Sequence, residues 1–167
     1  SGSSRLSSAA PNLDTSRPFS VSLWVYSTGL NADWQRLLSL QADSANFLQL
    51  YVPNVDNIIV AGMRANGVDT RQLSTTSLAT NTWHHLVVTW DGNDIQLYAN
   101  GISQSTVINN YPGADSTGRF TFGSRGDSSF FEGRLDEIGY WERVLTASER
   151  AELYNNGSGM AYPFGPV

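Results

Sequence analysis

The segment from Trp83 to Gly101 constrains the fold more than any other part of the chain. Apolar residues occupy alternate positions on both sides of Asp91-Gly92, as in two strands that each turn one face to a core. Glycine adopts the positive φ of a tight turn at little cost, so Asp-Gly between two such runs predicts a β-hairpin. Asn100-Gly101 predicts a second turn directly afterwards.

Further short strands are predicted along most of the chain. Phe19–Tyr26 alternates strictly between apolar and other residues, and it is the clearest strand in the sequence. Strands separated by turn residues at such short intervals are typical of an all-β sandwich or barrel. The other expected strands are 4–7, 35–41, 46–52, 57–64, 68–74, 102–108, 119–124 and 133–141.

One short helix is expected near the C-terminus. Thr146 and Glu149 have the spacing of a capping box, in which each side chain bonds the backbone N–H of the other residue. Asn155-Asn156-Gly157 directly follows Leu153-Tyr154 and predicts a left-handed helix end.

Three parts of the sequence resemble laminin-G-like domains, which are jelly rolls of the concanavalin A-like lectin/glucanase superfamily. They are Phe19–Tyr26, the hairpin with Trp83-His84-His85 at its start, and the closing segment from Phe131 through Glu149 to Leu153-Tyr154. The resemblance implies a two-sheet antiparallel jelly-roll β-sandwich with one short C-terminal helix. It covers nearly the whole chain, so residues 1–167 are expected to form one domain.

The composition favours an extracellular protein that binds neutral polar ligands. The net charge is −5, every basic residue is arginine, and Ser, Thr, Asn and Gly are abundant. The absence of cysteine excludes a disulfide framework but does not distinguish between compartments. Nucleic acids and anionic membranes require clustered positive charge, so neither is an expected partner. No apolar run approaches the ~20 residues of a membrane span, so membrane insertion is not expected. The first residue is Ser1, which favours a processed chain or a module excised from a larger protein with other domains as partners.

The sequence contains no convincing catalytic constellation. Glucanases of the superfamily carry paired carboxylates on one strand face, about 5–5.5 Å apart for retaining hydrolysis. Glu132 and Asp136 would share a face but lie about 13 Å apart along a strand. Asp136 and Glu137 are adjacent and are expected to point to opposite faces. His84 and His85 are expected to diverge in the same way, one hydrogen-bonded inside the sandwich and the other exposed. We therefore expect a protein that is not an enzyme.

Calcium is a candidate cofactor because the resembling domains often bind it at the sandwich rim. Calcium prefers six to eight oxygen ligands, which loops supply well. By the resemblance, the matching donors are Asp43 and Asn46 in one loop and Asp127 in another. The alternative is that these residues only cap the turns in which they lie.

Aromatic side chains in predicted turns, together with Trp24, Tyr26 and Tyr98 on the non-core strand face, are candidate ligand contacts, because sugar rings stack on exposed aromatic faces while polar side chains bind the hydroxyls. The expected ligand-binding residues are Trp34, Tyr111, Phe130, Phe131 and the neighbouring Arg125. Trp83, Trp90 and Trp141 fall in strand patterns and are expected to be core or half-buried.

These observations favour a non-catalytic recognition module that binds carbohydrate, a cell-surface glycan or a cell-surface protein, with calcium as a candidate aid. The expected location is secreted, on the cell surface or in a virion. One alternative is a structural subunit of a virion or cell surface that mediates protein–protein contact. A glycoside hydrolase is the third hypothesis, and it requires two carboxylates close together in a groove.

Overall fold

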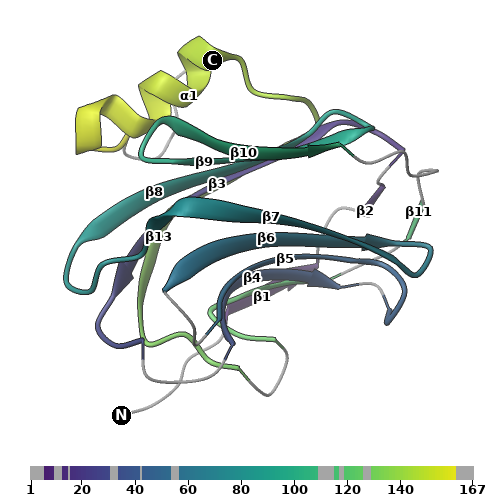
Figure 1. Ribbon diagram of the computed structural model, residues 1–167, viewed down its shortest axis with the longest axis horizontal. Coiled ribbons are helices and arrows are strands. Elements are labelled where there is room, and N and C mark those ends of the chain that lie inside the picture. The colour runs from purple at the N-terminus through teal and green to yellow at the C-terminus, as the bar shows by residue number, and fades with distance from the viewer. Residues whose placement is uncertain are drawn as a thin grey trace.

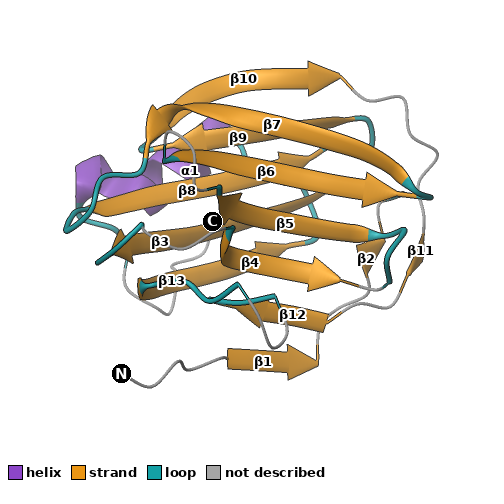
Figure 2. Ribbon diagram, turned by 60° about the horizontal axis from the view of Figure 1, so that its bottom comes forward, coloured by secondary structure: helices purple, strands orange, loops and turns teal. Residues whose placement is uncertain are grey.

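The computed structural model describes residues 6–9, 13–14, 16–30, 34–41, 43–53, 57–108, 115–116, 119–125 and 129–160. These residues form two stacked antiparallel sheets with a short helix on the outer side of one of them (Figure 1). Figure 2 shows the six-stranded sheet in front and the five-stranded sheet behind it. The predicted all-β jelly-roll sandwich is confirmed.

The six-stranded sheet has the order β1-β12-β4-β5-β6-β7, and the five-stranded sheet has the order β10-β9-β8-β3-β13. β2 and β11 pair separately. The bounds are β1 Leu6–Ala9, β2 Leu13–Asp14, β3 Phe19–Ser27, β4 Gln35–Gln41, β5 Phe47–Val52, β6 Ile58–Ala65, β7 Val68–Ser77, β8 Trp83–Trp90, β9 Asp94–Ala99, β10 Ile102–Ile108, β11 Asp115–Ser116, β12 Arg119–Phe122 and β13 Gly133–Trp141. Most predicted strands agree with these bounds to within two residues.

The core lies between the sheets and is built from alternate residues of their strands. Strand side chains alternate between faces, so one apolar half of each strand is enough to fill it. From the five-stranded sheet come Val21, Leu23 and Val25 of β3 with Leu86, Val88 and Trp90 of β8. Leu38 and Leu40 of β4 and Leu48 and Leu50 of β5 face them from the other sheet. Fully burying each such side chain contributes roughly 1.5–3 kcal/mol.

Helix α1 (Ala147–Tyr154) covers part of the outer face of the five-stranded sheet (Figure 1). Thr146 accepts from Glu149 N, and the Glu149 carboxylate accepts from Thr146 N at 2.7 Å, so the predicted capping box is confirmed. The helix ends at Asn155 in the left-handed conformation, followed by the 3-10 turn η1 (Asn155–Gly157). Leu145 and Leu153 pack on Val87 of β8. No helix in the described residues is long and apolar enough to span a membrane.

The prediction that one histidine of the pair is exposed is wrong, since His84 is 6% exposed and His85 is 2% exposed. His85 does point away from the core, but the ring of Tyr154 covers it at 5.9 Å between centroids. Its Nε2 lies 2.8 Å from the hydroxyl of Ser22, and burial lowers the pKa of His85 to about 4. His84 accepts from Ala79 N at 3.1 Å, and its pKa is also lowered, chiefly by burial.

Candidate functional site

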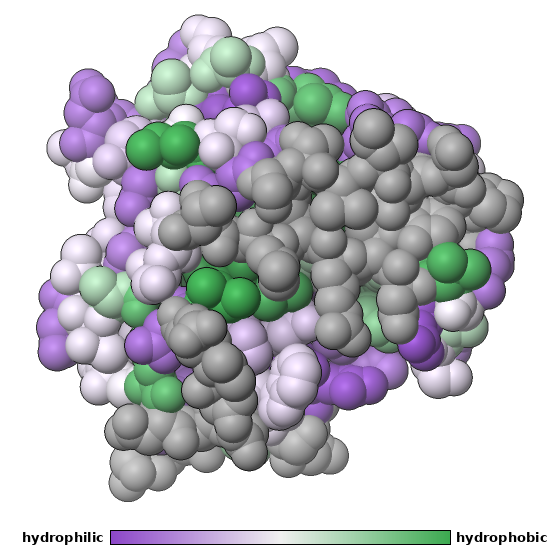
Figure 3. Space-filling view, viewed as in Figure 1, coloured by the Kyte–Doolittle hydropathy of each residue, from purple (hydrophilic) through white to green (hydrophobic). Residues whose placement is uncertain are grey.

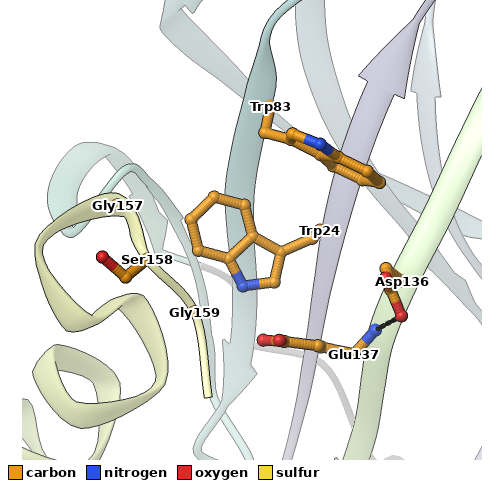
Figure 4. Close-up of a pocket in the computed structure, with 7 residues that line it drawn as sticks. All are labelled: Trp24, Trp83, Asp136, Glu137, Gly157, Ser158 and Gly159. Atoms are coloured by element: carbon orange, nitrogen blue, oxygen red, sulfur yellow. Dashed lines mark hydrogen bonds between the residues drawn. The ribbon is translucent and has the colours of Figure 1, made fainter. Parts of the chain in front are cut away.

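A pocket of about 200 Å³ opens on the outer side of the five-stranded sheet, between β13 and the turn that follows α1. Its lining consists of Trp24, Trp83, Asp136, Glu137 and the turn residues 157–159. Figure 4 shows the Trp24 indole between the Trp83 indole and the Glu137 carboxylate, with Asp136 and the turn on opposite sides. The pocket therefore combines aromatic surface with two carboxylates.

Asp136 and Glu137 line the same pocket because β13 contains a β-bulge. Asp136 pairs with Trp24 and Gly139 with Ser22, so β13 carries one extra residue between these two pairs. Glu137 has a φ of 46°, and its N–H donates to Asp136 Oδ1 at 2.8 Å. The prediction that the two adjacent carboxylates point to opposite faces is therefore wrong, since it assumed regular strand alternation.

The position of Glu137 is fixed by the turn after the helix. Its Oε2 accepts from Met160 N at 2.8 Å. A Cβ at Gly159 would lie 2.7 Å from the same Oε2, and the φ of Gly159 is +71°, so only glycine fits this approach. The acidic wall of the pocket and the turn are thus joined by a direct contact.

Trp24 forms the inner wall of the pocket and is only 5% exposed. Its ring packs on Tyr154 at 6.0 Å and on His85 at 5.0 Å between centroids. Its indole Nε1 is buried and finds no acceptor among the described residues. A buried donor of this kind is uncommon and costs about 1–3 kcal/mol, so a polar group entering the pocket would be stabilised if it reached this N–H.

Trp83 supplies the exposed aromatic surface, with 38% of the residue accessible. Trp83 is thus half-buried, as its strand pattern predicts. Alternation in β8 directs it outward with His85 and Val87, which Tyr154 and Leu153 of α1 cover. Beside it lies Tyr26 at 5.4 Å, and the guanidinium of Arg134 sits 5.5 Å from the Tyr26 centroid. Aromatic and polar surface therefore continues from the pocket along β3 and β13.

A second aromatic and basic cluster lies on the outer face of the six-stranded sheet. Leu48 and Leu50 of β5 face the core, so Tyr51 faces outward, opposite Arg36 of β4. The Arg36 guanidinium carbon lies 4.4 Å from the Tyr51 ring centroid and 5.7 Å from that of Trp34. Trp34 is 43% exposed.

The predicted contact residue Arg125 belongs to the same region. It is exposed, and its Nε donates to Gln41 Oε1 at 3.4 Å. Burial lowers the pKa of Arg36 to about 10, Tyr51 raises it, and the charge of Arg125 lowers it further. The structure thus brings two predicted ligand contacts, Trp34 and Arg125, to one arginine that the sequence reasoning did not select.

The other predicted contacts are Phe130, Phe131 and Tyr111. The first two directly follow Ser129, whose carbonyl accepts from Arg36 N at 3.1 Å. Phe131 packs against the core, which leaves Phe130, at 37% exposed, as the accessible member of that pair. Tyr111 lies outside the described residues. Hydrophobic side chains among the visible described residues form small separate patches between hydrophilic ones on the face in Figure 3.

Two of the predicted calcium donors, Asp43 and Asn46, make hydrogen bonds within and beside their own turn. Asp43 Oδ1 accepts from the N–H groups of Ala45 and Asn46 at 2.7 and 2.8 Å, and both carboxylate oxygens accept from the Asn46 amide. Asn46 Oδ1 accepts from Asn66 N at 3.0 Å. Asp127 lies outside the described residues, which contain no group of three or more potential metal ligands from His, Asp and Glu. Two of the three donors fit a turn cap as they stand, and calcium binding stays a prediction.

The sequence contains weak signals for the residues that were missed. Gly139 falls inside an otherwise regular strand pattern, and a glycine there often marks a bulge. Arg36 falls two residues after Trp34 and near the start of an apolar run, where a charged residue is unusual. Neither signal identifies which side chains meet.

A model of the family described as the concanavalin A-like lectin/glucanases superfamily matches residues 1–149. The chain belongs to this superfamily. A comparison with curated protein sequences finds no match.

Solved structures of the same superfamily fold are similar over most of the chain. Domain 4 of AbnA, a GH43 extracellular arabinanase from Geobacillus stearothermophilus solved in complex with arabinotriose, has a TM-score of 0.70 at 22% identity, covering 82% of this chain and 68% of that chain. The native heptameric SAP-like pentraxin from Limulus polyphemus has a TM-score of 0.68 at 18% identity, covering 90% of this chain and 75% of that chain. The binding domain of botulinum neurotoxin serotype G has a TM-score of 0.69 at 16% identity, covering 87% of this chain and 37% of that chain. These likenesses show the fold, which carries both carbohydrate-bound and other binding domains.

Proposed function

We propose that the chain is a non-catalytic carbohydrate-recognition module of an exported protein and that the Trp83 pocket is its binding site. The observation that carries the proposal is an exposed indole and two carboxylates around one open pocket. The apolar C–H face of a sugar ring packs on an aromatic ring, and carboxylates accept hydrogen bonds from its hydroxyl groups. The arabinotriose complex of the arabinanase domain supports a sugar as the class of ligand.

The size of the pocket favours recognition of one sugar ring at a time. Sites for drug-sized ligands span roughly 300–1,000 Å³, whereas this pocket has about 200 Å³. The remaining rings of an oligosaccharide would lie along Tyr26 and Arg134, beside the pocket. Trp24 Nε1 and the Ser158 hydroxyl are further polar groups at the wall.

Isothermal titration with arabinotriose, xylotriose, cellotriose and galactotriose tests this proposal. We expect one of these neutral sugars to bind the wild type and Trp83→Ala to weaken that binding at least about tenfold, because the stacking surface is lost. Ile102→Ala is the matched control, since Ile102 is 66% exposed on β10 and does not line the pocket. Equal affinity of the wild type and Trp83→Ala, or no binding of any of the four sugars, would contradict the proposal.

Glycoside hydrolysis is a second candidate, because Asp136 and Glu137 share a pocket. The Asp136 carboxylate already accepts a hydrogen bond from Glu137 N, and the Glu137 carboxylate accepts one from Met160 N. These bonds favour a role for both carboxylates as hydrogen-bond acceptors in binding. We therefore expect the bound sugar to remain intact over prolonged incubation. Release of new reducing ends by the wild type, abolished in Glu137→Gln, would show that the protein is a hydrolase instead.

A further inference from the structure

Arg36 is a buried cation that lacks an acidic partner among the described residues. The residue is 6% exposed, and its Nη1 donates to the backbone carbonyl of Trp34 at 3.1 Å. Its Nε is buried and makes no hydrogen bond with any described residue. Arginines buried to this extent are normally paired with a carboxylate, because an isolated charge is costly to remove from water.

The surroundings of Arg36 add positive charge. Tyr51 covers one side of the guanidinium, and Trp34 lies close to it as well. Among the described residues, the charge of Arg125, another cation, also acts on Arg36. Aromatic faces attract a guanidinium, but they do not replace the hydrogen bonds that its N–H groups would make with water or with an anion.

Trp34 is held in an unfavourable backbone conformation next to this charge. Its φ is 57°, in the left-handed region that bulky side chains rarely adopt. The carbonyl of the same residue accepts the hydrogen bond from Arg36, so the strained residue and the buried cation are directly linked. Backbone strain of this kind concentrates at functional sites.

We propose that Trp34, Arg36 and Arg125 form a binding site for an anionic group carried on a sugar ring. The anionic group is a carboxylate, as in a uronic acid, or a sulfate ester. Both present two or more oxygens that match the planar fork of a guanidinium. The exposed ring of Trp34 supplies the surface for the sugar itself. This site lies on the opposite sheet from the Trp83 pocket, and its ligand differs from the neutral sugars tested there.

The variant Arg36→Met tests the site, because methionine keeps much of the apolar volume and removes the charge. We expect Arg36→Met without ligand to melt at a higher temperature than the wild type, since it loses a buried cation that has no acidic partner among the described residues. A galacturonate trimer should raise the melting temperature of the wild type and bind Arg36→Met at least about tenfold more weakly. Neutral galactotriose, at the same concentration, should produce no Arg36-dependent shift.

Two further variants keep the test decisive if Arg36→Met does not fold. Arg125→Gln alters an exposed side chain, and it should weaken galacturonate binding severalfold because one of the two cations is lost. Arg150→Gln removes an arginine of α1, on the other sheet and outside the lining of the Trp83 pocket, and should leave galacturonate binding unchanged.

A sulfated galactose trimer, titrated in parallel with the galacturonate trimer, distinguishes the two anions. Binding of one of them identifies which group the site takes. Two results would overturn the proposal. One is no binding of either anionic trimer to the wild type. The other is binding that Arg125→Gln and Arg36→Met leave unchanged, which would assign Arg36 a structural role. Neither result bears on the Trp83 pocket, which the neutral sugars test separately.

Discussion

The outer faces of the two sheets each bury a basic side chain, but they do so in different ways. On the five-stranded sheet, His85 lies between Trp24 and Tyr154, hydrogen-bonds Ser22, and has a pKa lowered to about 4. It is therefore neutral at pH 7, and burial costs little. On the six-stranded sheet, Arg36 lies beside two aromatic rings with its pKa lowered only to about 10, so it stays charged.

The difference separates framework from candidate site. A buried base that can release its proton becomes one more packed, hydrogen-bonded ring, and the sheet face it covers is closed. A guanidinium cannot release its proton at neutral pH, so it stays charged when buried. An external anion, as proposed above, would offset the cost of burying that charge. Similar aromatic surroundings thus hold a neutral histidine on one sheet and a charged arginine on the other.

The largest expected effect is loss of the covering helix. Leu153→Ala removes the buried side chain that anchors α1 on Val87, and we expect it to lower the free energy of unfolding by about 2–4 kcal/mol. Urea unfolding followed by circular dichroism measures this. Val144→Ala, at a residue 38% exposed, should change stability by less than about 0.5 kcal/mol. A small effect at Leu153 would mean that α1 is not part of the framework.

Acid should lower the stability of the fold, because His84 and His85 are buried in their neutral forms. The unfolded chain binds a proton at His85 near pH 6.5 and the folded chain near pH 4, so stability is full above pH 6.5 and falls between these values. The expected loss at His85 is up to about 3 kcal/mol, and His84 adds to it in the same direction. Unfolding curves at pH 7.5 and 4.5 for the wild type and His85→Phe measure the difference.

In His85→Phe the loss of stability between these two pH values should shrink but not vanish, because His84 remains. An unchanged pH dependence in His85→Phe would show that His85 is accessible to protons in the folded state. That result would remove the contrast with Arg36.

A moderate effect is expected at the start of α1. Thr146→Ala deletes the hydroxyl that accepts from Glu149 N, and it should cost about 1 kcal/mol. Thr146→Ser keeps that acceptor and should recover most of the loss. If both variants unfold like the wild type, packing alone holds the helix on the sheet and its cap is dispensable.

The smallest effect concerns the loop with the predicted calcium donors. Asp43→Asn keeps an oxygen that can accept from Ala45 N and Asn46 N but loses the charge that calcium needs. If the residues serve only as a turn cap, the melting temperature should be the same with calcium as with a chelator, both for the wild type and for Asp43→Asn. A calcium-dependent rise in the wild type that disappears in Asp43→Asn would support the metal site.

The fold was predictable because it depends on repeated local patterns. Alternation, turn residues and the Thr146–Glu149 spacing each act over a few residues, and they specify strands, hairpins and the helix without knowledge of distant contacts. The exposed Trp34 was predicted as a contact for the same reason, since an aromatic residue between turn signals tends to remain accessible.

The arrangement of the candidate sites was not predictable, because it depends on one inserted residue and on long-range cover. The bulge in β13 turns Glu137 into the pocket with Asp136, and a regular strand would have separated them. His85 is covered by Tyr154, which lies far along the chain. The surroundings of Arg36 depend on Tyr51 of the neighbouring strand and on the backbone conformation of Trp34, and neither can be read from the sequence around Arg36.

The bulge in β13 also bears on whether a second copy could pair with the edge of the sheet. β13 lies at the edge of its sheet and pairs with β3 alone among the described strands. An exposed edge is a template on which another copy can extend the sheet. The extra residue between Asp136 and Gly139 interrupts the regular spacing of N–H and C=O groups, and Arg134 and Asp136 add exposed charge beside it. The residue that shapes the pocket therefore also makes this edge a poor partner for a second copy.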